Sequence, residues 1–275
     1  MNKVVMTIGC LVLTSALYAQ NADKLQLNVG QKIVFKSSDS IFNQQKRGDE
    51  SMDMKTTTTS HNMYEVINVS ASNYKLTSTL QKIKIDFEGF GQKMVYDSED
   101  PAKQTGMMAE QLKGKLGIAD TIELTLDGKM VEAADDKTKG KGKGRGMMRM
   151  MDQQSSNIEN AFLFVPVEAK EGTGWKKDQT KDGVKSQTIY FLDKLNGNMA
   201  EVSFKKKTKG TKVVSSQQGE MNIEVDNLSS GSLVVELKTG LVKQYNEELN
   251  SNTKMNMMGQ DMPSTGKTTT KIVIE

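Results

Sequence analysis

Methionine sulfur is the most plentiful group in this chain that could bind a metal ion. The sequence contains 19 methionines among 275 residues, and Met255, Met257, Met258 and Met262 form a cluster near its end. Thioethers are soft ligands that suit Cu(I) where cysteine is absent. Methionine is also a flexible apolar filler of cores and grooves, and Met255 and Met257 alternate with polar Asn256 as a half-buried strand does. We predict that this cluster lines a core or groove, with Cu(I) binding as the alternative.

Histidine and cysteine are too scarce for most catalytic or metal-binding sites. The chain has one of each, whereas a zinc site needs three or four His, Cys or carboxylate ligands. A serine nucleophile with a histidine base would have to use His61. Because His61 follows four threonines and Ser60, we interpret it as an exposed or hydrogen-bonded histidine at a turn between strands. We therefore assign no catalytic residue and no cofactor, and expect that the protein is not an enzyme.

An acidic turn is the one segment that resembles a calcium ligand set. Asp97, Glu99 and Asp100 precede Pro101 closely enough to contribute carboxylate oxygens to one ion. Acidic residues before a proline are also ordinary in solvated loops. We interpret this segment as such a loop.

The first 19 residues have the pattern of an export signal. A basic start at Asn2-Lys3 precedes an apolar run, Val4–Leu17, that is too short to span a bilayer, and Leu17-Tyr18-Ala19 resembles a cleavage site. Cys10 lies within this segment and is poorly placed for lipid attachment. We expect a mature chain without cysteine or disulfides, exported to the periplasm, the cell surface or the medium.

Charge and hydropathy exclude two further classes of protein. The 37 basic and 34 acidic side chains leave a net charge of +3, which is too weak a bias for a nucleic-acid-binding protein. After the signal segment, no stretch approaches the roughly 20 consecutive apolar residues of a membrane helix. We expect no nucleic-acid partner and no transmembrane segment in the mature chain.

The residues from Lys32 to Phe87 read as long antiparallel strands. They are rich in Thr, Val, Ile and Tyr with period-two alternation, and turn-forming residues interrupt them at 48–49 and 70–73. In the last of these strands, Leu80 and Ile83 have opposite parity although both are apolar. A bulge near Gln81-Lys82 would keep both on one face and bend the strand. The pattern predicts a strongly curved sheet.

A similar strand pattern returns near the end of the chain. From Leu241 to Met257 the odd positions include Leu241, Tyr245 and Leu249, and the even positions from 244 are polar. The four-residue spacing of these three would also suit a helix. We predict a strand because the segment contains four asparagines, which are poor helix formers.

Helical patterns are confined to two short segments. Met108, Leu112 and Leu116 recur at four-residue spacing, which predicts one helix. Ser156 and Glu159 form a capping box that predicts the start of a second.

The chain divides into two β-rich halves of similar pattern. After the signal peptide at 1–19, the first half covers 20–136, a basic Gly/Lys/Met loop covers 137–151, and the second half covers 152–275. The segment from Ile122 to Val131 resembles that from Leu233 to Val242, which suggests an internal repeat. The halves form either one continuous domain or two. We predict a mainly β fold: a curved antiparallel sheet, open and half-barrel-like, built from two related halves with two short helices.

Several short motifs, in their order and spacing, resemble those of the secreted bacterial family known as domain of unknown function 6263. After the export signal they are the early strand Met52–Thr57, the acidic turn Tyr96–Pro101, the stretch Pro166–Trp175, the segment Glu236–Val242 and the Met-rich run Lys254–Met262. The resemblance implies an exported, β-rich envelope protein. It brings no activity, ligand or functional residue.

Three functions fit these observations. The first is a non-catalytic envelope protein whose curved sheet holds a lipid or another hydrophobic molecule. The second is a Cu(I) binder that uses methionine sulfurs, and the third is a structural or protein-interaction module. We favour the first, by analogy with other curved-sheet carriers.

Overall fold

The fold is a single large antiparallel sheet. The computed structural model describes residues 24–47, 50–131, 158–216, 219–257 and 260–275. Its strands are β1 (Lys32–Arg47), β2 (Glu50–Val69), β3 (Asn73–Gly89), β4 (Gln92–Asp97), β5 (Ala119–Thr125), β6 (Gly174–Lys181), β7 (Val184–Asn196), β8 (Met199–Ser216), β9 (Gly219–Glu236), β10 (Val242–Met257) and β11 (Gln260–Ile274). The helical elements are α1 (Gly106–Leu112), η1 (Pro101–Lys103) and η2 (Ile158–Ala161).

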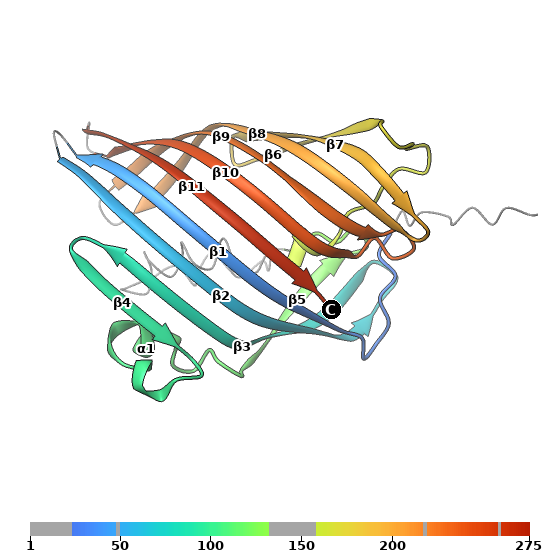
Figure 1. The fold of residues 1–275 in the computed structure, drawn as a ribbon, viewed down its shortest axis with the longest axis horizontal. Coiled ribbons are helices and arrows are strands. Elements are labelled where there is room, and N and C mark those ends of the chain that lie inside the picture. The colour runs from blue at the N-terminus through green and yellow to red at the C-terminus, as the bar shows by residue number, and fades with distance from the viewer. Residues whose placement is uncertain (1–23, 48–49, 132–157, 217–218, 258–259) are drawn as a thin grey trace, which may run out of the picture.

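The strand order joins both ends of the chain at the centre of the sheet. The 11 strands run in the order β4-β3-β2-β1-β11-β10-β9-β8-β7-β6, and β5 pairs with β3. The first and last strands, β1 and β11, pair along Phe35–Gln45 and so join the two halves of the sequence in one sheet. Figure 1 shows the sheet curling, with β6–β8 above the central strands and β3–β4 below them. The predicted fold class is therefore confirmed.

A bulge in β3 contributes to this curvature. His61 lies opposite Lys82, whereas its neighbour Asn62 lies opposite Leu80, so that Gln81 has no partner in β2. The extra residue lets Leu80 and Ile83 face the same side of the sheet despite their opposite parity. The bulge is at the predicted position.

The core lies on one face of the sheet, which we call the inner face. Leu76 of β3 and Leu192 of β7 belong to one buried cluster although they come from strands at opposite ends of the sheet. At its centre the Phe35 ring is fully buried and meets the Tyr64 ring edge-on at a centroid distance of 5.2 Å. Curvature therefore lets the inner face bury its own apolar residues.

Segments outside the strands complete this core. Leu25 and Leu27 are buried in it, and the Leu25 N–H donates to the carbonyl of Leu126 at 2.8 Å. From the other side the segment after η2 contributes Leu163 to the same cluster. Much of the apolar part of the inner face is thus covered by the protein's own chain.

The first predicted helix is present as α1. Its apolar residues Met108 and Leu112 are buried, and they pack with Ile85 and Phe87 of β3 in a second, smaller cluster. The helix ends at Leu112, and Leu116 forms an isolated bridge with Leu80 instead of a further helical turn. Within the described ranges, no helix has the length and apolar character needed to cross a membrane.

The second predicted helix is only the single 3-10 turn η2. Ser156, the expected cap, lies outside the described residues, and the chain leaves the turn after Ala161. Phe162 then forms a bridge with Leu241, and the Leu163 N–H donates to the Gly240 carbonyl at 2.9 Å. These bonds to the turn between β9 and β10 replace the helical ones that the sequence pattern predicted.

Candidate functional site

Two neighbouring rows of inward-facing side chains cross the sheet beyond the core. Strand pairing places the residues of each row opposite one another on successive strands, from β1 to β6. The first row is Asp39, Thr270, Glu247, Gly231, Phe204, Tyr190 and Trp175. The second is Ile41, Thr268, Leu249, Ser229, Lys206, Thr188 and Lys177. The first row is acidic and polar on β1, β11 and β10 and aromatic on β8, β7 and β6. The second row carries a lysine on β8 and another on β6.

A cavity of about 190 Å³ lies against the β6–β10 part of these rows. Its floor is formed by side chains of the sheet, and its opposite wall comes from the turn after β5, from η2 and from the two residues that follow η2. The lining residues are Asp127, Gly128, Lys129, Glu159, Asn160, Phe162, Leu163, Lys177, Gln179, Thr188, Tyr190, Phe204, Lys206, Leu233 and Tyr245.

Four aromatic rings form a continuous band on the inner face, and three of them, Tyr190, Phe204 and Tyr245, line the cavity. Trp175 stacks on Tyr190 with centroids 5.2 Å apart, Tyr190 lies 6.2 Å from Phe204, and Phe204 lies 5.8 Å from Tyr245. Gly231 makes room for this band, because a Cβ atom there would lie 2.6 Å from the Phe204 ring. Such rings offer a large apolar surface to a bound molecule.

The wall opposite the floor depends on a tight turn after β5. Gly128 has a φ of +77°, a conformation that residues with a side chain seldom adopt, and a Cβ atom there would lie 2.9 Å from the Phe162 ring. Gly240, its counterpart in the suspected repeat, has a φ of +71° and is as close to the Phe164 ring. The two turns thus have similar structures, while the repeat itself stays a prediction.

The acidic groups of the cavity already have partners. Asp127 forms an ion pair with Lys129 and accepts a hydrogen bond from the Thr125 hydroxyl. These bonds, with that from Lys129 the larger influence, lower the pKa of Asp127. Glu159 accepts a hydrogen bond from the backbone N–H of Met130 at 2.8 Å. Both carboxylates therefore belong to the cavity wall.

The lysines of the second row differ from these carboxylates in their bonding. Lys177 and Lys206 make no hydrogen bond or ion pair within the described part of the chain. Burial of the Lys177 amine by the cavity walls lowers its pKa, and the charges of Lys129 and Lys206 lower it further, against the opposing effects of Asp127 and Glu159. The lining carries three lysines against two carboxylates, so that its balance of charge is positive.

A buried carboxylate lies at the far end of the first row. Asp39 is 1% exposed, accepts a hydrogen bond from the Thr270 hydroxyl at 2.6 Å, and has no partner for Oδ2 within the described residues. Burial, and secondarily the charge of Glu247, raises the pKa of Asp39 to about 6 despite the opposing bond from Thr270. Glu247 in turn accepts a hydrogen bond from the Tyr245 hydroxyl at 2.7 Å. This polar group adjoins the aromatic band but does not line the cavity.

The predicted methionine cluster is only partly described. Met255 lies directly opposite Met262 across the β10–β11 pair and opposite Ile223 of β9. Met258 lies outside the described residues, and for Met257 only the backbone position opposite Gln260 is known. The strand prediction for this segment is confirmed. A Cu(I) site built from all four thioethers stays a prediction.

The prediction that His61 lies at a turn is wrong. His61 is a residue in the middle of β2, on the outer face and opposite Lys36 of β1 and Lys82 of β3. The strand continues for eight residues beyond His61. The threonines before it also pair with β1 and β3, so that no turn precedes it. The imidazole is therefore on the side of the sheet away from the cavity.

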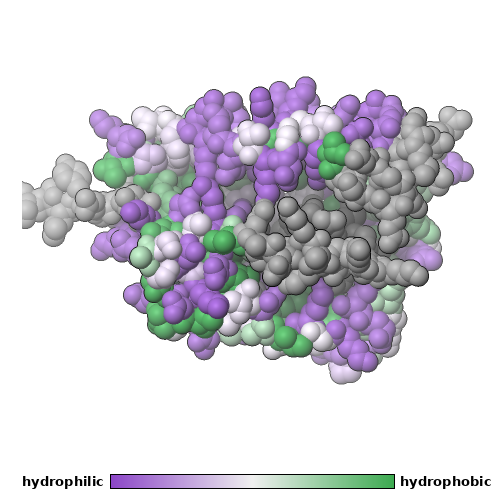
Figure 2. Space-filling model, turned by 180° about the vertical axis from the view of Figure 1, so that it is seen from behind, coloured by the Kyte–Doolittle hydropathy of each residue, from purple (hydrophilic) through white to green (hydrophobic). Residues whose placement is uncertain are grey.

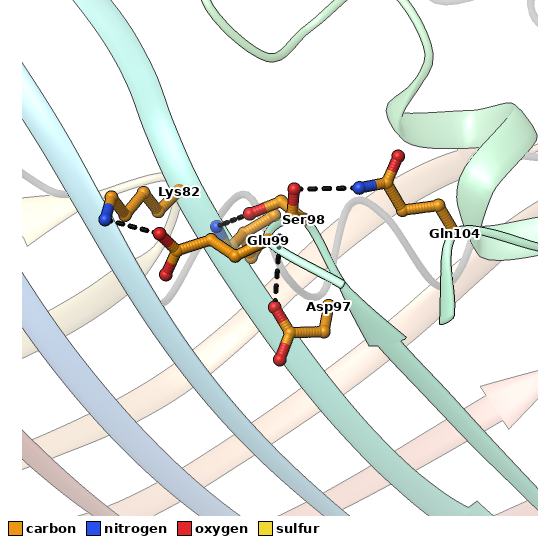
Figure 3. Close-up of polar contacts among 6 residues, drawn as sticks. Lys82, Asp97, Ser98, Glu99 and Gln104 are labelled. Atoms are coloured by element: carbon orange, nitrogen blue, oxygen red, sulfur yellow. Dashed lines mark hydrogen bonds and ion pairs between the residues drawn. The ribbon is translucent and has the colours of Figure 1, made fainter. Parts of the chain in front are cut away.

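The acidic turn is held by bonds within the protein, as Figure 3 shows. Asp97 accepts from the Glu99 N–H at 3.0 Å, and Glu99 forms an ion pair with Lys82. Asp100 caps η1 through the Ala102 N–H at 3.1 Å and pairs with a lysine one turn later. Asp97 thus holds the turn together, Glu99 fastens it to β3, and Asp100 fastens it to η1. The basic loop 137–151 lies outside the described residues.

Sequence reasoning missed the residues that form the cavity. Tyr190, Lys177 and Lys206 were not among the predicted site residues, and neither was Asp39, which lies in the same row as Tyr190 but outside the cavity. A signal was present for Lys177 and Asp39, because each shares the parity of an apolar residue earlier in its strand: Trp175 is two positions before Lys177, and Phe35 is four positions before Asp39.

An open antiparallel sheet with a half-enclosed cavity on its inner face defines the class of this protein. The chain belongs to a family of unknown function, DUF6263, whose model matches residues 71–242. This confirms the resemblance found in the sequence. Comparison with the curated proteins gave no match.

Two solved structures align with most of this chain at low identity. One, described as lipid-protein interactions in lipovitellin, is 12% identical, with a TM-score of 0.49, and the match covers 91% of this chain and 25% of that one. This chain therefore spans about a quarter of that chain's length. The other is an outer membrane channel from Pseudomonas putida F1, 7% identical, with a TM-score of 0.25, covering 92% of this chain and 98% of that one. Because both TM-scores are below 0.5, the functional proposal depends on the cavity alone.

Proposed function

We propose that this protein is an exported, non-catalytic envelope protein that holds the apolar part of a ligand, such as a lipid, in the cavity at β6–β10. One observation carries the proposal. A band of four aromatic rings runs along the cavity, three of them line it, and Phe204 and Tyr245 in this band are already buried by the protein itself. An apolar group that covered the rest of the band would gain roughly 25 cal/mol for each Å² removed from water.

The size of the cavity limits what can enter it. A volume of about 190 Å³ is below the roughly 300–1,000 Å³ of pockets that enclose a whole drug-sized ligand. We therefore expect one end of a longer molecule to be inside. The rest of the apolar inner face is less accessible to a ligand, because Leu25, Leu27 and Leu163 pack on it.

The cavity also supports a non-catalytic role. Its carboxylates Asp127 and Glu159 are engaged in bonds of the wall, and His61 is on the opposite face of the sheet. A catalytic pair needs a base within hydrogen-bonding distance of the group that it activates. Among the described lining residues, no histidine or cysteine is available for such a pair.

Binding can be followed through Trp175, the only tryptophan in the chain. Its indole stacks on Tyr190, which lines the cavity, so that a ligand on the aromatic band will change its fluorescence. We expect saturable changes on titration with dodecyl maltoside below its micelle concentration. If no amphiphile changed the fluorescence of Trp175, the proposal would be contradicted.

A pair of variants on one strand provides the control for this titration. Thr188 is 8% exposed and faces the cavity, and Thr188→Phe should fill the cavity and weaken binding at least tenfold. Gln187 is its neighbour on the outer face of β7, and Gln187→Phe should bind as the wild type does. Equal affinities in the two variants would show that the amphiphile binds elsewhere.

A further inference from the structure

We propose that the ligand of this cavity is an amphiphile with one anionic group, a carboxylate or a phosphate, bound between Lys177 and Lys206. The inference rests on the proposed function and names the polar end of the same ligand. It depends on where the two lysines lie, on their lack of partners and on their position beside the aromatic band.

The two lysines straddle one strand on the inner face. Lys206 of β8 lies opposite Thr188 of β7, which lies opposite Lys177 of β6. Adjacent strands are about 4.8 Å apart, so that the two lysine backbones are separated by roughly 10 Å. Each lysine stem is long and flexible, and both ammonium groups can therefore reach a single anion placed over Thr188.

The charges at the cavity favour an anion. Asp127 is paired with Lys129, and Glu159 accepts a backbone hydrogen bond, whereas Lys177 and Lys206 have no partner within the described residues. Burial and the charges of Lys129 and Lys206 lower the pKa of Lys177, although the carboxylates of Asp127 and Glu159 partly offset this effect. An anion between the two lysines would offset the repulsion between their charges.

The position of the aromatic band specifies the remainder of the ligand. Lys177 is two residues from Trp175 on β6, and Lys206 is two residues from Phe204 on β8. A two-residue step along a strand is about 6.6 Å. A charged group at the lysines would therefore have apolar surface immediately beside it, toward the core. That arrangement fits a molecule whose anionic head directly adjoins an apolar body.

The test compares head groups on one alkyl chain, with Trp175 fluorescence as the readout. The probes are dodecanoate, dodecyl phosphate, dodecyl maltoside and dodecyltrimethylammonium, with inorganic phosphate as the anion without a chain. We expect both anionic amphiphiles to bind at least tenfold more tightly than the maltoside. The Lys177→Gln, Lys206→Gln double variant should lose this preference and still bind the maltoside.

A matched variant on the same two strands controls for net charge. Lys176 and Lys205 are the neighbours of the two lysines on the outer face, and the Lys176→Gln, Lys205→Gln variant should keep the preference for anions. Equal binding of all head groups, or an unchanged preference in the Lys177/Lys206 variant, would overturn the inference while the proposed function stands. If none of the amphiphiles bound, both the inference and the proposed function would be overturned. If inorganic phosphate bound as tightly as dodecyl phosphate, the site would be one for a free anion. The inference that the ligand is an amphiphile would then be wrong.

Discussion

The Asp39→Asn variant is expected to be more stable than the wild type at pH 7, by up to about 3 kcal/mol. Asp39 is 1% exposed, and burial raises its pKa to about 6, compared with about 3.9 in an unfolded chain. Between these two values the folded state holds a proton that the unfolded state has lost. Stability therefore falls as the pH rises from about 4 to 6, and the full cost is present at pH 7. An amide has no such cost and still can accept the hydrogen bond of Thr270.

Urea unfolding between pH 4 and pH 7 measures this effect. The difference between variant and wild type should be small at pH 4, grow through pH 6 and then stay constant. Asp53 is an exposed aspartate on β2, and Asp53→Asn should change stability by less than about 0.5 kcal/mol at every pH. A stability difference for Asp39→Asn that does not depend on pH would show that the carboxylate is not ionised at a cost in the folded protein.

The Gly231→Ala variant is expected to lose about 3 kcal/mol of stability, the upper part of the usual range for overpacking. A Cβ atom at this position would lie 2.0 Å from the backbone oxygen of Asn246 and 2.6 Å from the ring of Phe204. The strand β10 can move away only by weakening its pairing with β9. The ring can move only by leaving the aromatic band, so that ligand affinity should fall as well.

Gly266 offers a matched control on the same face. A Cβ atom there would come closest to Asn43 Oδ1 and Ser251 Oγ, at 2.1 and 2.7 Å. Both are ends of side chains that can rotate away. We expect Gly266→Ala to be clearly less destabilising than Gly231→Ala in thermal or urea unfolding. If the two variants were equally stable, the claim that Phe204 packs closely on Gly231 of β9 would be wrong.

Strand-level features of the fold could be predicted from the sequence because the pattern is local. The opposite parity of Leu80 and Ile83 was sufficient to predict the bulge at Gln81. The segment after η2 could not be predicted in this way. Its hydrogen-bond partner is Gly240, almost 80 residues later in the chain, and this tertiary contact overrides the helical pattern that Glu159 begins.

The cavity could not be predicted because its residues are distant in the sequence. The two halves form one sheet because β1 pairs with β11. The similarity between the halves did not predict this pairing. Lys177 and Lys206 look like ordinary solvated residues in two lysine-rich strands. Only the register of β6, β7 and β8 shows that they lie in one row beside the aromatic band.

A crystal structure of the protein with 12-bromododecanoate tests the central claim most directly. Bromine marks the end of the alkyl chain by its anomalous scattering. We predict the carboxylate between Lys177 and Lys206, the adjoining part of the chain against Tyr190, Phe204 and Leu233, and the bromine peak outside the cavity, within one chain length of the two lysines. A bromine peak at another surface, such as the Met255–Met262 end of the sheet, or no peak at saturating ligand, would contradict the account.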